Sequence, residues 1–462
     1  MDLKGRKSLV LGAGRSGSES ARFLAERGAL VALHDKKEVD HWDESARSLR
    51  ESHNIGLLAG EIPSWLLDQI DLVVISPGVP TKTLPARYVE RKDGEIIGEV
   101  ELAYRFLKGR IVAITGSNGK TTTTTMIGEL LRDAGFTTLV GGNIGTPLLS
   151  LIEASSDDSW IVAELSSFQL ETIKYFHPNV AVCLNVTPNH LDRYDSFIDY
   201  AAAKHRIFMN QTPADAAILN ADDKVTASWT SGLRGSVSMF SVAQELDNGL
   251  FLRGRELISR NDGRERVLTT RDEIILPGLH NVENVLAALA AGLACGADPD
   301  SMRRTIAGFR GVEHRLEFVD TIEGVDFFND SKATSVDATL KALQAMGERP
   351  GKIVLIIGGR GKKAPYAPLR PLIEKYVRAM VVIGEDAENI ANELKGSAAM
   401  VNEATLAEAV VRSLELAKGG DAVLLAPACA SFDMFGSFEE RGRAFKEAVA
   451  NIGAGRAAGS KI

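Results

Sequence analysis

Residues 111–125 read IVAITGSNGKTTTTT, and this segment constrains the fold of the chain more than any other. The apolar run 111–114 predicts a strand, and the apolar spacing through Leu131 predicts a helix that starts directly after the glycines. A glycine-rich loop between a strand and a helix turns backbone N–H groups toward phosphate oxygens, and the helix N-terminus adds partial positive charge. The segment therefore predicts a nucleoside triphosphate site in an α/β sheet rather than a solvated turn.

The loop is a shorter variant of the phosphate-binding P-loop, because the strict pattern has a glycine where Ile114 stands. In a P-loop the lysine reaches the terminal phosphates, which assigns that role to Lys120. The hydroxyl group that follows ligates Mg²⁺, so Thr121 is a candidate metal ligand.

Length and composition are those of a globular protein with several domains. The chain has 462 residues, 45% of them hydrophobic and 25% charged, which predicts two or three domains. Its net charge is −8 without a long basic block, so we expect no nucleic-acid partner. No stretch approaches the roughly 18 apolar residues that span a bilayer, and no signal or transit peptide precedes the first strand pattern. Scattered Cys183, Cys295 and Cys429 fit buried thiols, so we expect a cytoplasmic protein without a membrane partner.

Alternating strand and helix patterns divide the chain into segments 1–97, 98–310 and 311–462. Such alternation favours parallel sheets, so we expect three α/β domains: Rossmann-like in the first and last segments and P-loop-type in the middle one. Region 230–275 predicts an antiparallel insertion, and region 279–295 predicts an alanine-rich helix. The expected strands are 7–11, 30–35, 72–76, 111–114, 160–164, 180–185, 325–328, 352–357, 379–383 and 422–426.

Gly12, Gly14 and Gly17 follow the first expected strand and open a helix, and Asp35 ends the next strand. This is the dinucleotide-binding fingerprint, in which glycines let the backbone approach a diphosphate. On its own it predicts an NAD-dependent dehydrogenase. The same turn is a general anion cradle that holds a uridine diphosphate equally well, and the sequence identifies no hydride-transfer site.

Polar residues follow the strands of the middle segment, where an α/β sheet presents its ligands. Glu164 ends an apolar strand and is a candidate Mg²⁺ ligand, although Ser166 and Ser167 beside it also fit an ordinary helix start. His190 follows another strand and can bind a metal or orient a substrate, whereas a lone histidine is more often structural. Lys204 lies on an expected helix, where a solvent-facing lysine is the ordinary interpretation.

Three loops in the last segment combine cations, acids and hydroxyl groups after apolar strands. They are NDSKAT at 329–334, GGRGKK at 358–363 and PACASFD at 427–433. Arg315, close to a glycine-rich bend, is placed to meet a phosphate. Loops of this kind that converge on one crevice predict a polar substrate site.

Together these motifs resemble the ATP-dependent Mur ligases of peptidoglycan synthesis. They occur in the family's order over essentially the whole chain: TGSNGKTT, GGNIG, ELSSFQL, NVTPNHLDRY, GLHNVENVLAA, HRLE, NDSKAT, GGRGKK and PACASFDMF. Within the family the chain is most similar to the branch that adds D-glutamate to UDP-N-acetylmuramoyl-L-alanine. One departure is Asn189, where the family often has an acidic residue before the histidine.

The resemblance implies a mechanism that uses ATP and Mg²⁺. The γ-phosphate would pass to the alanyl carboxylate, and the amino group of D-glutamate would then attack the acyl phosphate. By resemblance, the catalytic residues are Lys120, His190 and Lys204. The residues expected at ATP are Gly116, Ser117, Asn118, Gly119, Lys120, Thr121, Thr122, Asn284, Arg315 and Asp330. Those expected at the metal are Thr121, Glu164, His190 and a carbamylated Lys204.

The resemblance also implies two further substrate pockets and a monomeric protein. The residues expected at the UDP substrate are Gly14, Arg15, Ser16, Asp35, Lys36, Ser76, Pro77, Gly78 and Asn143. Those expected at D-glutamate are Lys332, Thr334, Lys362, Ser431 and Phe438.

Other functional classes stay open at this point. An NAD-dependent dehydrogenase is one alternative, and a non-catalytic nucleotide-binding regulator is another. Among ligases, another Mur ligase or a folylpolyglutamate-type ligase with a different amino acid is also compatible with the motifs.

Overall fold

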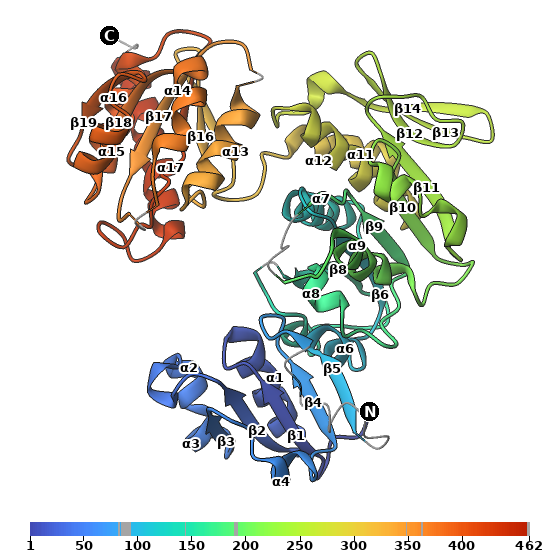
Figure 1. Ribbon diagram of the computed structural model, residues 1–462. Helices are drawn as coiled ribbons and strands as arrows, with labels where there is room; N and C mark the ends of the chain where they lie inside the picture. Colours follow the sequence, from blue (N-terminus) through green and yellow to red (C-terminus); the bar gives the residue numbers. More distant parts are fainter. Residues whose placement is uncertain are drawn as a thin grey trace. The chain divides into compact units, whose positions relative to one another are not determined.

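A computed structural model describes residues 1–81, 84, 94–143, 145–188, 193–347, 349–361 and 364–459, with side chains to residue 453. The chain forms two compact units, one of residues 1–271 and 283–306 and one of residues 272–282 and 307–462. Among the described residues, two sheets lie in the first unit and one in the second (Figure 1). The strands of these sheets do not interleave along the chain. The predicted succession of three α/β folds is therefore confirmed.

The first sheet has the strand order β3-β2-β1-β4-β5 of a Rossmann fold, and all its neighbouring strands are parallel. Gly17 lies where helix α1 approaches the loop after β1. A Cβ atom at this position would lie 1.8 Å from the Gly12 carbonyl oxygen, so only glycine permits the approach. The strands are β1 (Lys7–Leu11), β2 (Leu30–Asp35), β3 (Gly56–Ala59), β4 (Leu72–Ile75) and β5 (Glu95–Gly98). The helices are α1 (Arg15–Glu26), α2 (Glu44–Arg47), α3 (Leu49–His53), α4 (Ser64–Leu67) and α6 (Glu99–Tyr104).

The second sheet has the order β14-β13-β12-β11-β10-β9-β6-β8-β7. Its last three strands along the chain are antiparallel and extend one edge, as predicted for the insertion, whereas β11 pairs in parallel with β10. The strands are β6 (Arg110–Thr115), β7 (Thr138–Gly142), β8 (Trp160–Glu164), β9 (Val180–Cys183), β10 (Ala216–Asn220), β11 (Ser236–Ser241), β12 (Gly249–Arg253), β13 (Glu256–Asn261) and β14 (Arg264–Thr270). The helices are α7 (Lys120–Asp133), α8 (Ser167–Leu170), α9 (Phe197–His205), α10 (Lys224–Ala227), α11 (Leu279–Ala294) and α12 (Pro299–Gly308).

The third sheet has the order β15-β16-β20-β17-β18-β19, parallel except for the β15–β16 pair. Helices cover both faces, so two separate apolar clusters form its core. The strands are β15 (Glu317–Ile322), β16 (Val325–Asn329), β17 (Ile353–Gly358), β18 (Val377–Ile383), β19 (Ala399–Asn402) and β20 (Ala422–Leu425). The helices are α13 (Val336–Met346), α14 (Arg370–Tyr376), α15 (Ala387–Glu393), α16 (Leu406–Leu416) and α17 (Phe438–Gly459).

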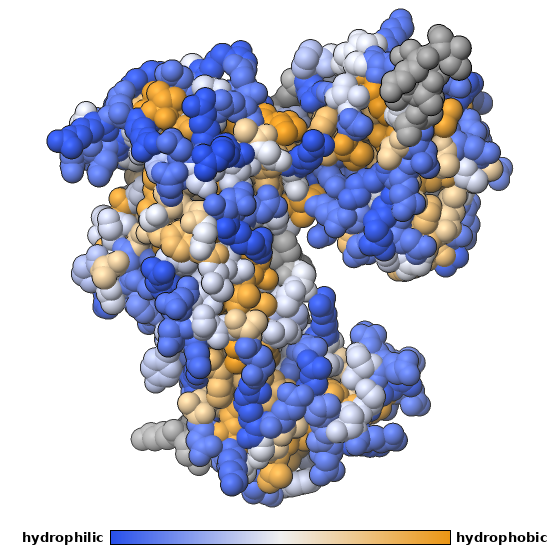
Figure 2. All heavy atoms as spheres, turned by 180° about the vertical axis from the view of Figure 1, so that it is seen from behind, coloured by the Kyte–Doolittle hydropathy of each residue, from blue (hydrophilic) through white to orange (hydrophobic). Residues whose placement is uncertain are grey.

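The surface carries few large hydrophobic areas. The face in Figure 2 is mostly hydrophilic, with hydrophobic side chains in scattered groups. The thiols of Cys183, Cys295 and Cys429 are buried and unpaired, as predicted. Among the helices within the described ranges, none is both long and apolar enough to cross a membrane.

Helix α6 carries two buried carboxylates that join the two sheets of the first unit. Glu101 Oε2 accepts hydrogen bonds from the three consecutive backbone N–H groups of 174–176, at 2.8, 3.0 and 3.0 Å. Glu99 Oε1 accepts one from the Leu148 N–H at 3.2 Å. Burial raises the pKa of Glu99 to about 7, although its hydrogen bonds act in the opposite direction. The join between the sheets therefore contains a carboxyl group that titrates near neutral pH.

Glu99 makes the stability of the first unit depend on pH in a defined direction. The folded-state pKa lies above the ordinary glutamate value of 4.5, so the folded protein binds more protons than the unfolded chain between about pH 4.5 and 7. The free energy of unfolding contributed by this group therefore falls as the pH rises through that window. Glu99→Gln should remove a pH-dependent contribution of about 3 kcal/mol.

Urea unfolding at a series of pH values between 4.5 and 8 measures this contribution. Substitution of the exposed Glu51 by glutamine controls for the loss of any carboxylate. A Glu99→Gln variant with the same pH slope as the parent protein would show that Glu99 does not titrate in this window.

Candidate active site

The phosphate loop lies between β6 and α7, at the carboxyl edge of the second sheet. Gly119 is the N-cap of α7 and has a left-handed conformation with φ 81°. A Cβ atom on Gly119 would lie 2.3 Å from Asn284 Oδ1, so the glycine lets helix α11 approach the loop. The Thr123 hydroxyl donates to the same Asn284 oxygen at 3.3 Å. The structure therefore brings Asn284, predicted at the nucleotide, against the loop from a distant part of the chain.

Lys120 and Lys204 converge on one backbone carbonyl group. Lys120 Nζ donates to the carbonyl oxygens of Gly116 and Ser117, at 2.9 and 3.1 Å. Lys204 Nζ donates to the Gly116 oxygen at 2.8 Å, and its side chain is buried. The solvent-facing interpretation of Lys204 is therefore wrong, because the short helix α9 points this lysine at the loop.

Burial and the nearby Lys120 ammonium lower the pKa of Lys204 to about 7. The ammonium group also lies 4.8 Å from the centre of the Tyr200 ring. The Tyr200 hydroxyl in turn forms a 2.9 Å hydrogen bond with Ser117 Oγ of the loop. A sizeable fraction of Lys204 is thus the neutral amine near pH 7, which is the form that reacts as a nucleophile.

Glu164, at the end of β8, forms an oxygen-rich pair with the first turn of α7. Its Oε2 atom accepts a hydrogen bond from the Thr121 hydroxyl at 2.9 Å, and its Oε1 atom accepts one from Asn143 Nδ2 at 2.9 Å. Glu164 is 2% exposed and is also followed by a capping box, in which Ser166 is the N-cap of α8. The helix-start interpretation of the segment is therefore confirmed, and the role of Glu164 as a metal ligand stays a prediction.

The donor set at Glu164 fits Mg²⁺, which prefers hard oxygen ligands and usually completes its shell with water and substrate phosphates. A hydroxyl and a carboxylate lie within hydrogen-bond distance at the start of α7. Within the described ranges, no group of three or more His, Cys, Asp or Glu side chains forms an all-protein metal site. The predicted His190 lies outside the described residues.

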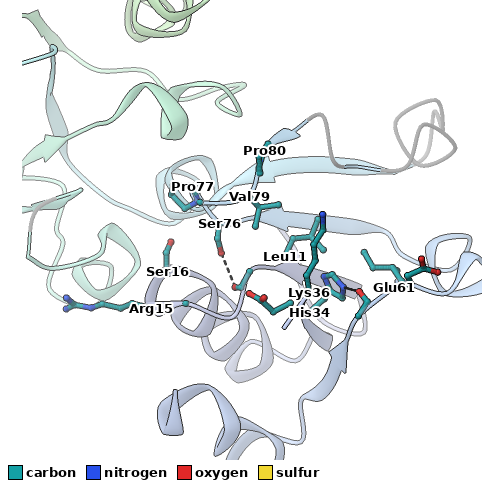
Figure 3. A pocket seen from close by; sticks show the side chains of 16 residues that line it. Leu11, Arg15, Ser16, His34, Lys36, Glu61, Ser76, Pro77, Val79 and Pro80 are labelled. Carbon is teal, nitrogen blue, oxygen red and sulfur yellow. Dashed lines mark hydrogen bonds between the residues drawn. The ribbon is translucent and has the colours of Figure 1, made fainter. Parts of the chain in front are cut away.

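A cavity of about 1080 Å³ opens in the first sheet at the loops after β1, β2 and β4 (Figure 3). Asp35 Oδ2 accepts the Ala13 N–H at 2.9 Å, and Ser76 Oγ donates to the Gly12 carbonyl at 3.1 Å. In Figure 3 the Arg15 side chain points away from the other labelled residues. The predicted residues that line this cavity are Gly14, Arg15, Ser16, Asp35, Lys36, Ser76, Pro77 and Gly78.

Asn143 is the predicted residue that does not line this cavity, because it lies against Glu164 at the second sheet. The lining residues that the sequence analysis missed are Leu11, Gly12, His34, Gly60, Glu61, Ile62, Val79 and Pro80. They are the ends of the same strands and the loop after β3. The Rossmann strand order could have identified them, since all these strand ends share one edge.

In the second unit, Asp330 follows β16 and is almost fully buried. Burial raises its pKa to about 7, although Arg315 and Lys332 act in the opposite direction. His314 and Leu316, on either side of the exposed Arg315, have left-handed backbone conformations with φ 63° and 42°. Such conformations are uncommon for residues other than glycine and occur often at functional sites.

The residues predicted at D-glutamate occupy loops at the carboxyl edge of the third sheet. Lys332 is exposed, with its Nζ atom 6.0 Å from the centre of the Phe438 ring. Ser431 is buried in the loop after β20, and the Thr334 N–H donates to the Lys332 carbonyl at 2.8 Å. Lys362 lies outside the described residues.

Arg441 is a buried residue of this region that sequence analysis missed. Its guanidinium donates to Ser331 Oγ, Ser331 O and Cys429 O at 2.9–3.2 Å, and burial lowers its pKa to about 10. It therefore ties the loop after β16 to the loop after β20. In the sequence it looks like one of several charged residues on an exposed helix, and only the fold places it inside.

Three family models match consecutive parts of the chain. The Mur ligase MurD-like N-terminal domain matches residues 6–98, the Mur ligase middle domain residues 114–292, and the Mur ligase glutamate ligase domain residues 314–429. The chain is 46% identical over 453 residues to the UDP-N-acetylmuramoylalanine–D-glutamate ligase of Pelotomaculum thermopropionicum, covering 98% of this chain and 99% of the relative. It is 47% identical over 450 residues to the enzyme of that name from Solibacter usitatus, covering 97% and 98%.

Solved structures show the same fold at lower identity. UDP-N-acetylmuramate–alanine ligase from Thermotoga maritima matches with a TM-score of 0.55 at 22% identity, over 96% of this chain and 99% of the other. A pseudomurein peptide ligase type C from Methanothermus fervidus matches with a TM-score of 0.54 at 19% identity, over 97% and 100%. With the family models and the full-length relatives, these matches establish that the chain belongs to the Mur ligase family.

Proposed function

We propose that this chain is an ATP-dependent, ADP-forming ligase that joins D-glutamate to UDP-N-acetylmuramoyl-L-alanine. It acts as a cytoplasmic monomer in the synthesis of peptidoglycan precursors. The observation that carries the reaction type is the convergence of Lys120, Lys204 and the Thr121–Glu164 pair on one phosphate loop. The choice of D-glutamate is supported by the names of the relatives that align over nearly the whole chain.

The reaction must replace the poor leaving group of a carboxylate. An oxygen of the alanyl carboxylate attacks the γ-phosphorus of ATP, the bond to the β-phosphate oxygen breaks, and an acyl phosphate and ADP form. The amine of D-glutamate then attacks the carbonyl carbon, loses a proton, and expels inorganic phosphate as the amide forms. Negative charge moves between phosphate oxygens throughout. Fixed cations and backbone N–H groups lower this barrier because they are already oriented toward the charge.

The chain's own residues supply these groups at the phosphate loop. Lys120 holds the β- and γ-phosphate oxygens, together with the N–H groups at the start of α7. Thr121 and Glu164 would hold one Mg²⁺, and His190 with a carbamylated Lys204 would hold a second; the metal would neutralise phosphate charge. The lowered pKa of Lys204 supports carbamylation, because the neutral amine is the form that adds CO₂.

The remaining substrate groups have candidate sites in each unit. Gly14, Ser16 and Asp35 line the cavity of about 1080 Å³, and its position at the N-terminus of α1 supports it as the uridine diphosphate site. D-Glutamate carries two carboxylates, which suit the cations and hydroxyl groups of the third sheet. The residues proposed for that pocket are Lys332, Thr334, Lys362, Ser431 and Phe438.

Product formation separates this proposal from its alternatives. Purified protein with ATP, Mg²⁺, UDP-N-acetylmuramoyl-L-alanine and D-glutamate should release one phosphate for each UDP-N-acetylmuramoyl dipeptide formed, as followed by phosphate assay and mass spectrometry. Replacing D-glutamate by L-glutamate, glycine or L-lysine tests for ligases with another amino acid. Absorbance at 340 nm with NAD tests for a dehydrogenase. Product with another amino acid but none with D-glutamate would contradict the proposed specificity.

Lys120→Ala should lower kcat several hundredfold while the protein stays folded. The loss of one fixed contact to developing charge typically raises the barrier by about 3–4 kcal/mol. Lys224→Ala removes an exposed lysine from helix α10 of the same unit and should keep normal turnover, which controls for net charge. Near-normal turnover in Lys120→Ala would show that this loop is not the phosphate-binding site.

Lys204→Ala should lose activity and regain part of it in millimolar acetate or formate, because a short carboxylate can replace the carbamate oxygens. The same salts should not rescue Lys120→Ala, in which the missing group is a cation. Initial rates at several carboxylate concentrations measure the rescue. Full activity without added carboxylate would show that Lys204 has no ligand role.

A further inference from the structure

Tyr366 forms a buried hydrogen-bonded chain with two residues from other loops of the third sheet. Its hydroxyl donates to Asp386 Oδ2 at 2.6 Å, and its oxygen lies 3.0 Å from Cys429 Sγ. Tyr366 is 2% exposed and Cys429 is fully buried. Because the phenol gives its proton to the carboxylate, the thiol is the donor in the second bond. Burial raises the pKa of Cys429 to about 11, which keeps the proton on sulfur.

This hydrogen-bonded chain of three side chains connects three loops at the carboxyl edge of the third sheet. Tyr366 follows the glycine-rich loop after β17, Asp386 is the N-cap of α15 after β18, and Cys429 lies in the loop after β20. The loops after β17 and β20 also exchange two backbone hydrogen bonds between Arg360 and Ala430, at 2.9 and 3.0 Å. The Tyr366 hydroxyl therefore connects the same two loops a second time, through side-chain contacts.

The glycine-rich loop packs directly on this hydroxyl chain. A Cβ atom at Gly361 would lie 2.1 Å from Asp386 Oδ2 and 3.1 Å from the Tyr366 hydroxyl. The backbone at 361 thus approaches the carboxylate as closely as a glycine allows. The glycine-rich loop is therefore in close contact with the Asp386 carboxylate. On the opposite loop, Ser431 lies two residues beyond Cys429.

We propose that the hydrogen-bonded chain Cys429–Tyr366–Asp386 is a positioning device for the amino-acid pocket. It holds Ser431 and the backbone of residues 358–361 at fixed positions relative to each other. These residues do not touch the substrate themselves. The inference rests on the proposed function for the identity of the amino acid, but the fastening of the two loops is independent of it.

Tyr366→Phe tests the role of the hydroxyl group, because it keeps the ring and its packing. The KM for D-glutamate should rise about tenfold, the factor that corresponds to the loss of one charge-assisted hydrogen bond. The KM values for ATP and for UDP-N-acetylmuramoyl-L-alanine should change less than twofold. Tyr376→Phe, at a tyrosine whose ring packs over Gly347 in the same unit, is the matched control and should leave all three constants unchanged.

Thiol labelling measures the fastening without any enzyme assay. All three cysteines are buried, so a maleimide reaches each thiol only when the surrounding structure opens. Tyr366→Phe should raise the labelling rate of Cys429 about tenfold in native buffer and leave those of Cys183 and Cys295 unchanged, as located by peptide mass spectrometry. If Tyr366→Phe fails to fold, Asp386→Asn is the second variant, because it removes the charged acceptor at the surface end of the hydrogen-bonded chain. It should raise the labelling rate of Cys429 in the same way.

The outcomes separate this inference from the proposed function. Faster labelling of Cys429 with an unchanged KM for D-glutamate would reduce the chain to a purely structural role and overturn the inference. Unchanged labelling would show that the hydroxyl does not fasten the loops. If Cys429 is labelled selectively in the variant but the parent protein makes no D-glutamyl product, the connection between the loops is confirmed. Only the proposed identity of the amino acid is then overturned. In the double variant Tyr366→Phe/Asp386→Asn, additive effects on labelling would contradict a single shared hydrogen bond.

Discussion

The Gly116 carbonyl oxygen accepts hydrogen bonds from two ammonium groups, and the rest of the central site depends on this arrangement. Lys120 reaches it from the start of α7, and Lys204 reaches it from α9. Burial, together with the nearby Lys120 charge, lowers the pKa of Lys204, which makes it chemically different from an ordinary lysine. In the same loop, Gly119 has no side chain, and this allows Asn284 to pack against the loop. Removing either contact would change the position of both cations.

The three sheets place their polar groups by the same rule. In each sheet, the charged and polar side chains discussed above lie in loops that follow parallel strands, where the strands end at a common edge. In the first sheet these loops line a cavity, and in the second they bring Thr121, Glu164 and Lys204 to one helix N-terminus. In the third they are tied to one another by Arg441 and Tyr366 from inside. Buried hydrogen bonds thus hold the loops at the edges of the second and third sheets in defined positions.

Much of this could be predicted from the sequence, because apolar runs between turn residues define parallel strands. The bounds of β1, β2 and β8 agree with the expected ranges, and half of the residues that line the cavity of the first sheet were expected at the UDP substrate from the family resemblance. Contacts between distant segments could not be predicted in this way. Asn143 was expected at the UDP substrate, which stays a prediction; its amide lies on Glu164, since β7 and β8 are neighbours in the second sheet.

Buried polar residues were the main omission, for a physical reason. Arg441 and Tyr366 belong to residue types that usually lie at the surface or pack as ordinary aromatic residues. No local pattern signals that their polar atoms face inward, because their partners come from loops 12–110 residues away. Lys204 shows the same limit: its local sequence fitted a solvent-facing lysine, the family resemblance alone suggested a role, and the fold buries it against the phosphate loop.

The central claim is that the chain activates the alanyl carboxylate by phosphorylation. Transfer of oxygen from substrate to phosphate tests it most directly. With UDP-N-acetylmuramoyl-L-alanine labelled with ¹⁸O in both carboxylate oxygens, each turnover with ATP and D-glutamate should release one inorganic phosphate that carries one ¹⁸O atom. Mass spectrometry of the phosphate measures this transfer. Stoichiometric phosphate without ¹⁸O would mean that water, not the carboxylate, had attacked ATP, and would contradict the proposed mechanism.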